Sequence, residues 1–392
     1  MALIEQLEPY VDEMLRCTRC GFCQSACPIY DELRTESAVA RGRVQLLLGL
    51  REGRLEPTET IVRYLYRCLD CRLCQQTCPG GVRTDEIFEG ARRWLAKAGL
   101  IPEPLQALGR RVAECHNIAG EENSHRLMWQ ENLPARRQMT KKAEIAFFPG
   151  CVASLYPLVY GIPQSFVSLL EAAGLSFAML NGEEWCCGYP LLAAGMPIDE
   201  LITHNVAAIE ALGVRWLVTT CPSCYKTWKT VYPQSTFEVI HATELLVKLL
   251  EEGRLVPSRP PTIRREAGAE GPLRVTYHDP CDLGRKAGIY DPPRRILEQI
   301  PGIRLVEMTA NRANANCCGG GGNLESLEAG LSANIAERRL EQAQAVGAEA
   351  VATACQQCQR TLSMAARRRR LRLPVLDVSQ VLIASIGEGN IS

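Results

Sequence analysis

Ten of the nineteen cysteines form one pattern that occurs twice in the chain. Each copy has a lone cysteine, then an adjacent cysteine pair followed by glycine, then a Cys-x-x-Cys step. The first copy consists of Cys151, Cys186, Cys187, Cys221 and Cys224, and the second of Cys281, Cys317, Cys318, Cys355 and Cys358. Clustered thiolates bind soft metals and iron–sulfur clusters, and little else explains five thiols repeated in one order. The chain therefore contains a duplicated metal-binding unit.

Eight further cysteines form two runs near the N-terminus, each with the spacing Cys-x-x-Cys-x-x-Cys-x-x-x-Cys-Pro. They are Cys17, Cys20, Cys23 and Cys27, and then Cys68, Cys71, Cys74 and Cys78. The spacing is typical of bacterial [4Fe–4S] proteins, in which three close cysteines bind one cluster and the fourth binds the other. We therefore expect one cubane on Cys17, Cys20, Cys23 and Cys78, and a second on Cys68, Cys71, Cys74 and Cys27. A pair of zinc sites is the alternative, but two complete runs with both prolines favour iron.

The interval between the two runs has helical character. Residues 37–50 are rich in Arg, Ala, Gln and Leu, and Thr58 is a suitable N-cap for the next helix, which carries Ile61, Leu65 and Tyr66 on one face. Two clusters connected by helices predict an α-helical ferredoxin module over residues 1–96.

Short apolar or β-branched runs precede the cysteines of the repeats. These runs are 145–148, 216–219, 274–277 and 350–353, and helical patterns lie between them at 198–212 and 327–346. Alternating strands and helices predict an α/β fold with a parallel sheet in each repeat. Because ligands lie at the carboxyl ends of such strands, three cysteine groups can converge on one point.

Composition indicates where the linkers and the two cysteine-rich domains begin and end. Residues 97–142 are polar, helical in pattern and without cluster ligands, which predicts a helical linker. Residues 256–272 are rich in proline and charge and separate the repeats. The two cysteine-rich domains are therefore expected at 143–255 and 273–392.

The glycines that follow each cysteine pair suggest a close approach of the backbone to a bound group. Gly188 follows the first pair, and Gly319 and Gly320 begin a run of four glycines after the second. Glycine lets the chain turn where two adjacent thiols would otherwise diverge. We therefore expect these three glycines to contribute to cofactor binding. A phosphate loop is the alternative, but the spacing and the lysine of such loops are missing.

Two histidines and one aspartate stand in informative places. His241 and Asp377 occupy matching positions in the repeats, and helix capping is the favoured interpretation for both, with a hydrogen bond to cluster sulfur as the alternative. His278 lies three residues before Cys281 and is the better candidate for such a hydrogen bond or for proton delivery. Cys115 fits no ligand spacing and is expected to be a core residue.

Bulk properties exclude several classes of protein. The formal net charge is zero, which gives no indication of a nucleic-acid partner. No apolar run is long enough to span a membrane, and the first residues lack the features of a signal peptide. The many cysteines then favour metal binding in a reducing compartment. The sequence predicts a cytoplasmic protein, with peripheral association at the inner membrane face as an alternative.

The chain resembles a known family over nearly its whole length. The two cysteine repeats are similar to tandem cysteine-rich CCG domains, and the segments RCTRCGFCQSACPIY and RCLDCRLCQQTCPGGVRTDEI are similar to the glycolate oxidase iron–sulfur subunit. The complete second repeat, with CCGGGGN and CQQC, looks more like heterodisulfide reductase. In that family each CCG motif holds a noncubane [4Fe–4S] cluster. The resemblance implies one or two such clusters here in addition to the two cubanes, with zinc possible in one CCG motif.

The resemblance implies an electron-transfer function. The expected partner is an FAD-containing dehydrogenase subunit that oxidises glycolate, lactate or a similar 2-hydroxy acid. The expected acceptor is a quinone or another carrier, including one associated with a membrane. The alternative is a disulfide or heterodisulfide reductase, or the iron–sulfur subunit of an anaerobic glycerol-3-phosphate dehydrogenase. In the reductase the catalytic residues would be His278 and the second-repeat cysteines, Cys281, Cys317, Cys318, Cys355 and Cys358.

Overall fold

Two similar parallel sheets form the centre of the two repeats. The computed structural model describes residues 4–131, 133, 143–263 and 270–387. The first sheet has the strand order β2-β1-β3-β4 and the second has the order β6-β5-β7-β8. The strands are β1 (Ile145–Phe147), β2 (Phe177–Ala178), β3 (Trp216–Thr219), β4 (Glu238–His241), β5 (Leu273–His278), β6 (Ile303–Leu305), β7 (Ala350–Thr353) and β8 (Val375–Asp377). All four strands predicted from the sequence are present, and the α/β fold with a parallel sheet in each repeat is confirmed.

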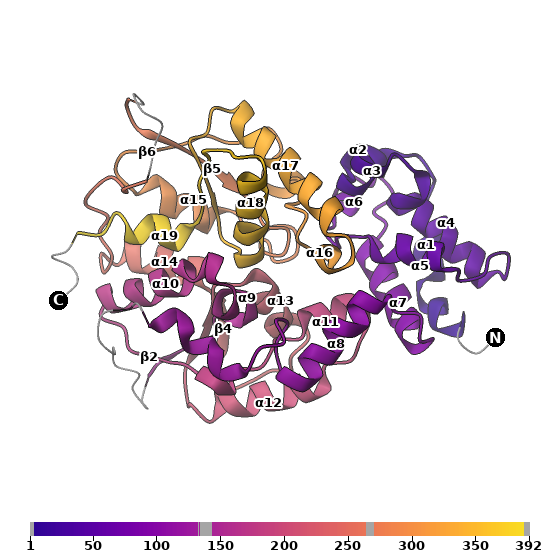
Figure 1. The fold of residues 1–392 in the computed structure, drawn as a ribbon, viewed down its shortest axis with the longest axis horizontal. Coiled ribbons are helices and arrows are strands. Elements are labelled where there is room, and N and C mark those ends of the chain that lie inside the picture. Colours follow the sequence, from indigo (N-terminus) through magenta and orange to yellow (C-terminus); the bar gives the residue numbers. More distant parts are fainter. Residues whose placement is uncertain (1–3, 132, 134–142, 264–269, 388–392) are drawn as a thin grey trace.

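Helices cover the sheets and join the two repeats. The first repeat contains α9 (Gly150–Leu155), α10 (Gly161–Ala172), α11 (Tyr189–Ala194), α12 (Asp199–Glu210), α13 (Pro222–Thr230) and α14 (Ala242–Glu251). The second contains α15 (Asp291–Glu298), α16 (Leu324–Leu327), α17 (Ala329–Ala345), α18 (Gln356–Arg368) and α19 (Val378–Ile383). Helix α10 packs on α19 and α14 packs on α15, so one apolar core runs through both repeats (Figure 1). Burial of this shared core fixes the orientation of one sheet relative to the other.

Helices alone build the N-terminal module among its described residues. The elements are η1 (Ile4–Tyr10), α1 (Val11–Leu15), α2 (Phe22–Ala26), α3 (Pro28–Leu33), η2 (Glu36–Ala38), α4 (Ala40–Arg51), α5 (Glu59–Tyr66), α6 (Leu73–Gln76) and α7 (Thr84–Lys97). Thr58 caps α5 by accepting a hydrogen bond from the Ile61 amide at 3.4 Å. The module forms a lobe at one end of the molecule, beside both repeats (Figure 1).

The segment between the module and the first sheet packs into the first repeat. It contains α8 (Glu103–Cys115) and η3 (Asn123–Gln130), and residues 132 and 134–142 lie outside the described residues. Helix η3 contacts α9, and the indole of Trp129 is buried in the core of the repeats. Residues 97–131 therefore contribute to the core of the first repeat as well as joining it to the module.

In each repeat the residue that ends the last strand also caps the helix that follows it. His241 caps α14 and Asp377 caps α19, each in a capping box that includes the side chain of Glu244 or Gln380. The prediction that both residues are caps is confirmed. Burial lowers the pKa of His241 to about 3, so this imidazole is neutral at physiological pH.

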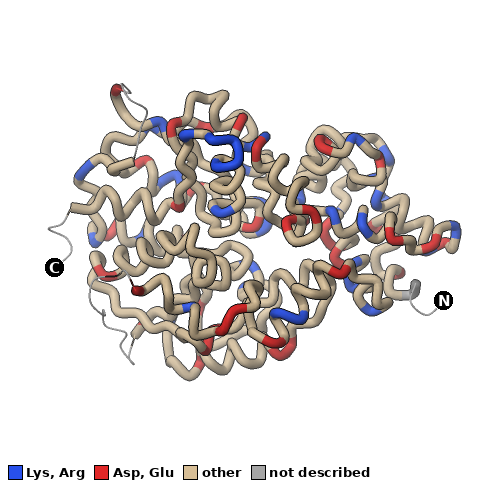
Figure 2. The backbone as a smooth tube through the Cα atoms, viewed as in Figure 1, with Lys and Arg blue, Asp and Glu red and all other residues tan. Residues whose placement is uncertain are grey.

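Charge is distributed evenly over most of the molecule. Basic and acidic residues are interspersed over the backbone, with one basic group at the end of α18 (Figure 2). In that group Arg368 and Arg369 form ion pairs with Glu337 of α17, as expected for the solvated end of a helix. None of the helices in the described ranges combines the length and the hydropathy that a membrane span needs.

Candidate iron–sulfur centres

The first N-terminal cysteine run shares a cavity with the last cysteine of the second run. Cys17, Cys20, Cys23 and Cys78 line a cavity with an empty volume of about 410 Å³, which Cys74 of the second run also reaches. Cys20 is exposed, whereas the other three thiols are partly buried. Four thiols that face one small cavity are a donor set suited to a cubane cluster.

A second cavity collects the complementary four cysteines. Cys27, Cys68, Cys71 and Cys74 line an empty volume of about 430 Å³, and helices α2 and α6 pack against each other between the two cavities. Cys27 and Cys71 are buried. Burial raises the pKa of Cys27 to about 11, a cost that ligation by iron offsets because a coordinated thiol loses its proton. The crossed grouping agrees with the ligand sets expected from the spacing, and ligation itself stays a prediction.

Both loops curl in the same way. Arg19 and Gly21 in the first loop have positive φ angles, and Asp70 and Arg72 have them at the matching places of the second. Left-handed conformations are rare for residues with a side chain, so they indicate that the surrounding structure imposes the turn. In each loop they direct successive thiols toward one cavity.

The five cysteines of each repeat gather at the carboxyl edge of its sheet. Cys151 follows β1 and Cys221 follows β3, and in the second repeat Cys281 follows β5 and Cys355 follows β7. Gly188 and Gly319 have φ angles of 90° and 88°, so each turns the chain just after its cysteine pair. The Sγ atoms of Cys318 and Cys358 lie 3.1 Å apart. The convergence expected from the α/β pattern is present in both repeats.

One large cavity lies between the two CCG motifs. Its empty volume is about 1260 Å³, and nine of the ten repeat cysteines line it. Tyr156, Tyr189, Glu325 and Arg360 also line it, and the Arg360 guanidinium lies over the Tyr156 ring. The two motifs therefore face a common space that has apolar and charged walls.

The tenth cysteine, Cys317, faces the ferredoxin module. It packs in one buried group with Cys27 and Cys71 of the second cubane site. A hydrogen bond between Cys317 and Cys71 lowers the pKa of the Cys71 thiol. The second CCG motif and the second cubane site are thus in direct contact.

The glycine run makes close approaches to protein atoms. A Cβ atom on Gly319 would lie 2.4 Å from the Ser332 carbonyl oxygen, and one on Gly320 would lie 2.6 Å from the Thr361 hydroxyl. A Cβ atom on Gly188 would meet Ile198 at 2.8 Å. These contacts explain the glycines without a bound group, and a role of Gly188, Gly319 and Gly320 in cofactor binding stays a prediction.

Replacing Gly319 with valine should prevent metal loading of the second repeat. The new side chain would meet the backbone of α17 at a residue with positive φ, at a cost of about 3 kcal/mol. We expect loss of the second-repeat metal with retention of the first, measured by iron and zinc analysis together with electron paramagnetic resonance (EPR). Full metal content in this variant would contradict the prediction.

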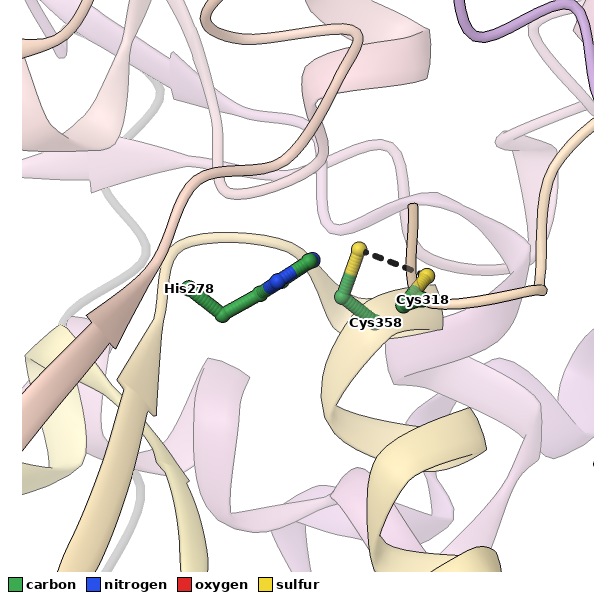
Figure 3. A group of neighbouring side chains, drawn as sticks. All are labelled: His278, Cys318 and Cys358. Atoms are coloured by element: carbon green, nitrogen blue, oxygen red, sulfur yellow. Dashed lines mark hydrogen bonds between the residues drawn. The ribbon is translucent and has the colours of Figure 1, made fainter. Parts of the chain in front are cut away.

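His278 points at two cysteines of the second motif. It ends β5, and one of its ring nitrogens lies together with the Sγ atoms of Cys318 and Cys358, all three atoms being within 4.8 Å of one another (Figure 3). Nε of Arg339 donates a hydrogen bond to His278 Nδ1 at 3.0 Å, which places the imidazole proton on Nε2. Burial lowers the pKa of His278, so the ring is a neutral donor toward the sulfurs. In the first repeat the matching residue is Phe148, so only the second motif has this donor.

A buried ion pair supports the first motif instead. Arg126 donates to Glu184 Oε1 at 2.6 Å and to Cys151 Sγ at 3.1 Å, and both side chains are almost fully buried. Burial raises the pKa of Glu184 to about 8, although Arg126 opposes this shift. Sequence reasoning missed both residues. Glu184 lies two residues before Cys186, which was a usable signal, but nothing in the sequence marks Arg126.

Some cysteine and histidine residues lie away from these sites. Cys115 ends α8, is partly buried and lines neither the two cubane cavities nor the cavity between the CCG motifs. His116 and His204 stack on the two faces of Trp185, at ring separations of 3.6 and 3.7 Å. Because Trp185 precedes Cys186, this stack supports the first cysteine pair.

Comparisons with known proteins agree with this architecture. A family model described as a 4Fe-4S dicluster domain matches residues 13–82, and one described as a cysteine-rich domain matches residues 145–229 and 275–363. A ferredoxin module joined to paired CCG domains defines an iron–sulfur oxidoreductase subunit that takes part in electron transfer.

Similarity to curated proteins extends over almost the whole chain. A subunit of the dihydromethanophenazine:CoB–CoM heterodisulfide reductase from Methanosarcina barkeri is 31% identical over 96% of this chain and 94% of its own. A probable glycolate oxidase iron–sulfur subunit from Bacillus subtilis is 26% identical over the same shares of the two chains. The EtfAB:quinone oxidoreductase of Syntrophomonas wolfei is 27% identical over 93% of this chain and 57% of its own. The chain belongs to the heterodisulfide reductase and glycolate oxidase family of iron–sulfur subunits.

Proposed function

We propose that this chain carries electrons between an FAD-containing 2-hydroxyacid dehydrogenase and the paired CCG motifs, and from there to a quinone or another carrier. Bound [4Fe–4S] clusters would supply one-electron storage at each cysteine site. The observation that carries the proposal is the direct contact between Cys71 of the second cubane site and Cys317 of the second CCG motif. It supports a continuous path from the outer cubane site through the inner one to the CCG motifs.

Hydrogen bonds and ion pairs that are mostly buried hold the two sites in contact. The Arg285 guanidinium donates to the Cys71 carbonyl oxygen and to the Ala315 carbonyl oxygen, both at 2.6 Å. Beside it, the buried Lys286 ammonium lies 2.6 Å from Asp70 of the module and 2.8 Å from Asp282. Burial alone would lower the pKa of Lys286, but the two carboxylates raise it well above its usual value. A paired charge of this kind fixes the spacing between the two sites.

A flavoprotein donor agrees with the sequence and with the relatives. The chain has no dinucleotide-binding fingerprint, so the flavin is assigned to a partner subunit. One relative bears the name of a glycolate oxidase subunit and another that of a quinone oxidoreductase. These names favour a 2-hydroxy acid as the electron source and a quinone as the acceptor.

The proposal is tested by following the cluster absorbance under anaerobic conditions. The oxidised protein is mixed with its copurified flavoprotein, and glycolate or D- or L-lactate is added. Bleaching that requires both the flavoprotein and one 2-hydroxy acid is the expected result. Failure of every 2-hydroxy acid to bleach clusters that dithionite reduces would refute this donor.

The partner should dock at the outer cubane site. Cys20 is exposed there, and the neighbouring Phe22 and Leu15 side chains are 60% and 64% exposed. Large apolar side chains at this exposure are typical of interaction sites when they occur together. The exposed Arg19 is in the same loop, which favours a partner with an apolar centre and an acidic rim.

Replacing Phe22 with serine should weaken the partner without disturbing the cluster. Removing this contact should cost about 1–2 kcal/mol of binding, or roughly tenfold in affinity. The measurement is the flavoprotein concentration that gives half-maximal bleaching, with dithionite reduction as the control for cluster integrity. Met364→Ser is the matched control, because Met364 is also an exposed apolar residue but lies on α18. An unchanged concentration dependence for Phe22→Ser would reject this docking site.

The shared cavity favours a second candidate function, the reduction of a disulfide between the two CCG motifs. Each turnover would consume two electrons and two protons and would convert one S–S bond into two thiols. The carrying observation is that nine repeat cysteines line one cavity. Two of them, Cys318 and Cys358, lie close to the His278 donor. The similarity to a heterodisulfide reductase subunit adds weight to this candidate.

The second candidate has a separate assay. Dithionite-reduced protein, freed of excess reductant, is incubated with cystine, glutathione disulfide or the CoB–CoM heterodisulfide. Stoichiometric release of thiols with reoxidation of the clusters is expected. If no disulfide releases thiol, this function is excluded and the electron-transfer proposal is unaffected.

A further inference from the structure

The side chain of Gln356 belongs by sequence to the second CCG motif but makes its hydrogen bonds in the first repeat. It lies between Cys355 and Cys358 and is fully buried. Its Nε2 atom donates to the Pro149 carbonyl oxygen at 2.6 Å and to the Thr220 hydroxyl at 2.8 Å. Its Oε1 atom accepts from the Ala153 amide at 3.0 Å.

These three partners surround two cysteines of the first motif. Pro149 and Ala153 flank Cys151, and Thr220 precedes Cys221. The Gln356 amide therefore joins the loop after β1 to the loop after β3. Both loops carry first-motif thiols, so their separation depends on a residue from the other repeat.

A reciprocal contact runs in the opposite direction. Ser223 lies between Cys221 and Cys224 of the first motif, and its hydroxyl donates to Asp282 Oδ2 at 2.5 Å. Asp282 follows Cys281 of the second motif and is buried. Each Cys-x-x-Cys step thus supplies one side chain that holds a cysteine loop of the other repeat.

We propose that Gln356 and Ser223 are crossed positioning residues, each of which sets the geometry of the metal site in the opposite CCG motif. Residues beyond the ligands orient the ligands and tune the metal, and loss of such partners weakens metal binding. A buried amide that loses three hydrogen bonds also leaves its former partners unsatisfied. The inference rests on the proposal that both motifs hold metal.

The test first assigns a signal to each motif. The full-length protein is prepared without oxygen, and Cys187→Ala and Cys318→Ala identify which EPR signal and midpoint potential belong to the first and to the second motif. If Cys187→Ala removes no signal but lowers zinc content, the first motif holds zinc. That result rejects a cluster there, and the comparison below then follows zinc content instead.

The decisive variant is Gln356→Leu, which keeps the approximate volume of the side chain and removes its three hydrogen bonds to the first repeat. We expect loss of the first-motif metal, or a shift in its potential and line shape, while the second-motif signal is retained. Gln359→Leu is the control, because Gln359 is a buried glutamine of the same helix whose amide donates to Gln380 within the second repeat. A first-motif signal that is unchanged in Gln356→Leu would overturn the inference.

Ser223→Ala provides the mirror test and is a milder change. It should shift the second-motif signal, although the substituted residue lies in the first motif. If Gln356→Leu fails to fold, Ser223→Ala alone tests whether the two positioning residues act across the repeats. A second-motif signal identical to that of the unmodified protein would then reject the crossed arrangement.

Discussion

Replacing Cys78 with serine is expected to remove the cubane cluster that lies farther away in the sequence. Cys78 lines the cavity of Cys17, Cys20 and Cys23 and does not line the other one. The rest of its own run lines the other cavity with Cys27, and of these three cysteines only Cys74 also reaches the first cavity. Loss of one of four thiolates should destabilise the cluster at the exposed site, so that about four irons are lost per polypeptide. Iron analysis and EPR of the reduced protein measure the result.

The reverse variant and a neutral one complete the experiment. Cys27→Ser should remove the cluster on Cys68, Cys71 and Cys74 and leave the outer one. Cys115→Ser should change neither, because Cys115 lines neither of the two cubane cavities. Crossed ligation is wrong if Cys78→Ser disturbs only the inner cluster, which contacts Cys317.

Local spacing was enough to predict the four strands that lie just before cysteines, but not β2, β4, β6 and β8, which have no cysteine just after them. The runs before Cys151, Cys221, Cys281 and Cys355 form β1, β3, β5 and β7. A short apolar or β-branched run that ends at a loop is typical of a buried strand. The ends of parallel strands then bring the cysteines of each repeat together by topology. The same reasoning placed the caps at Thr58, His241 and Asp377, since capping depends on a few adjacent residues.

Contacts between segments distant in the sequence could not be predicted in this way. Arg126 reaches Cys151 from a segment that carries no cluster ligand, and Gln356 reaches the first repeat from the second. Each contact depends on how whole modules pack, and a single amino-acid sequence does not show which distant positions meet. The glycine run is an intermediate case. Its sequence indicates close approach to a bound group, whereas the approaches seen in the structure are to protein atoms, and for the last two glycines these atoms belong to the ferredoxin module.

Replacing Gly322 with valine is expected to separate that module from the second CCG motif. A Cβ atom on Gly322 would lie 2.3 Å from the Cys68 carbonyl oxygen, and one on Gly321 would lie 2.7 Å from that of Leu69. The backbone of the glycine run therefore rests directly on the inner cubane loop. Because Gly322 also has a φ angle of 58°, valine should lower the free energy of unfolding by about 3 kcal/mol.

The consequence for function is a slower transfer between intact sites. With the Cys71–Cys317 contact opened, the cubanes should be reduced at the normal rate while the second-motif signal develops late, as followed by rapid-freeze EPR after mixing with dithionite. Gly288→Val is the control that introduces backbone strain without a clash against the cubane loop. Gly288 has a φ angle of 76°, and no neighbouring atom lies within 4 Å of its Cβ position. That control should lose stability but keep the transfer rate. Equal rates in Gly322→Val and the unmodified protein would mean that electrons reach the CCG motifs by a route other than this contact.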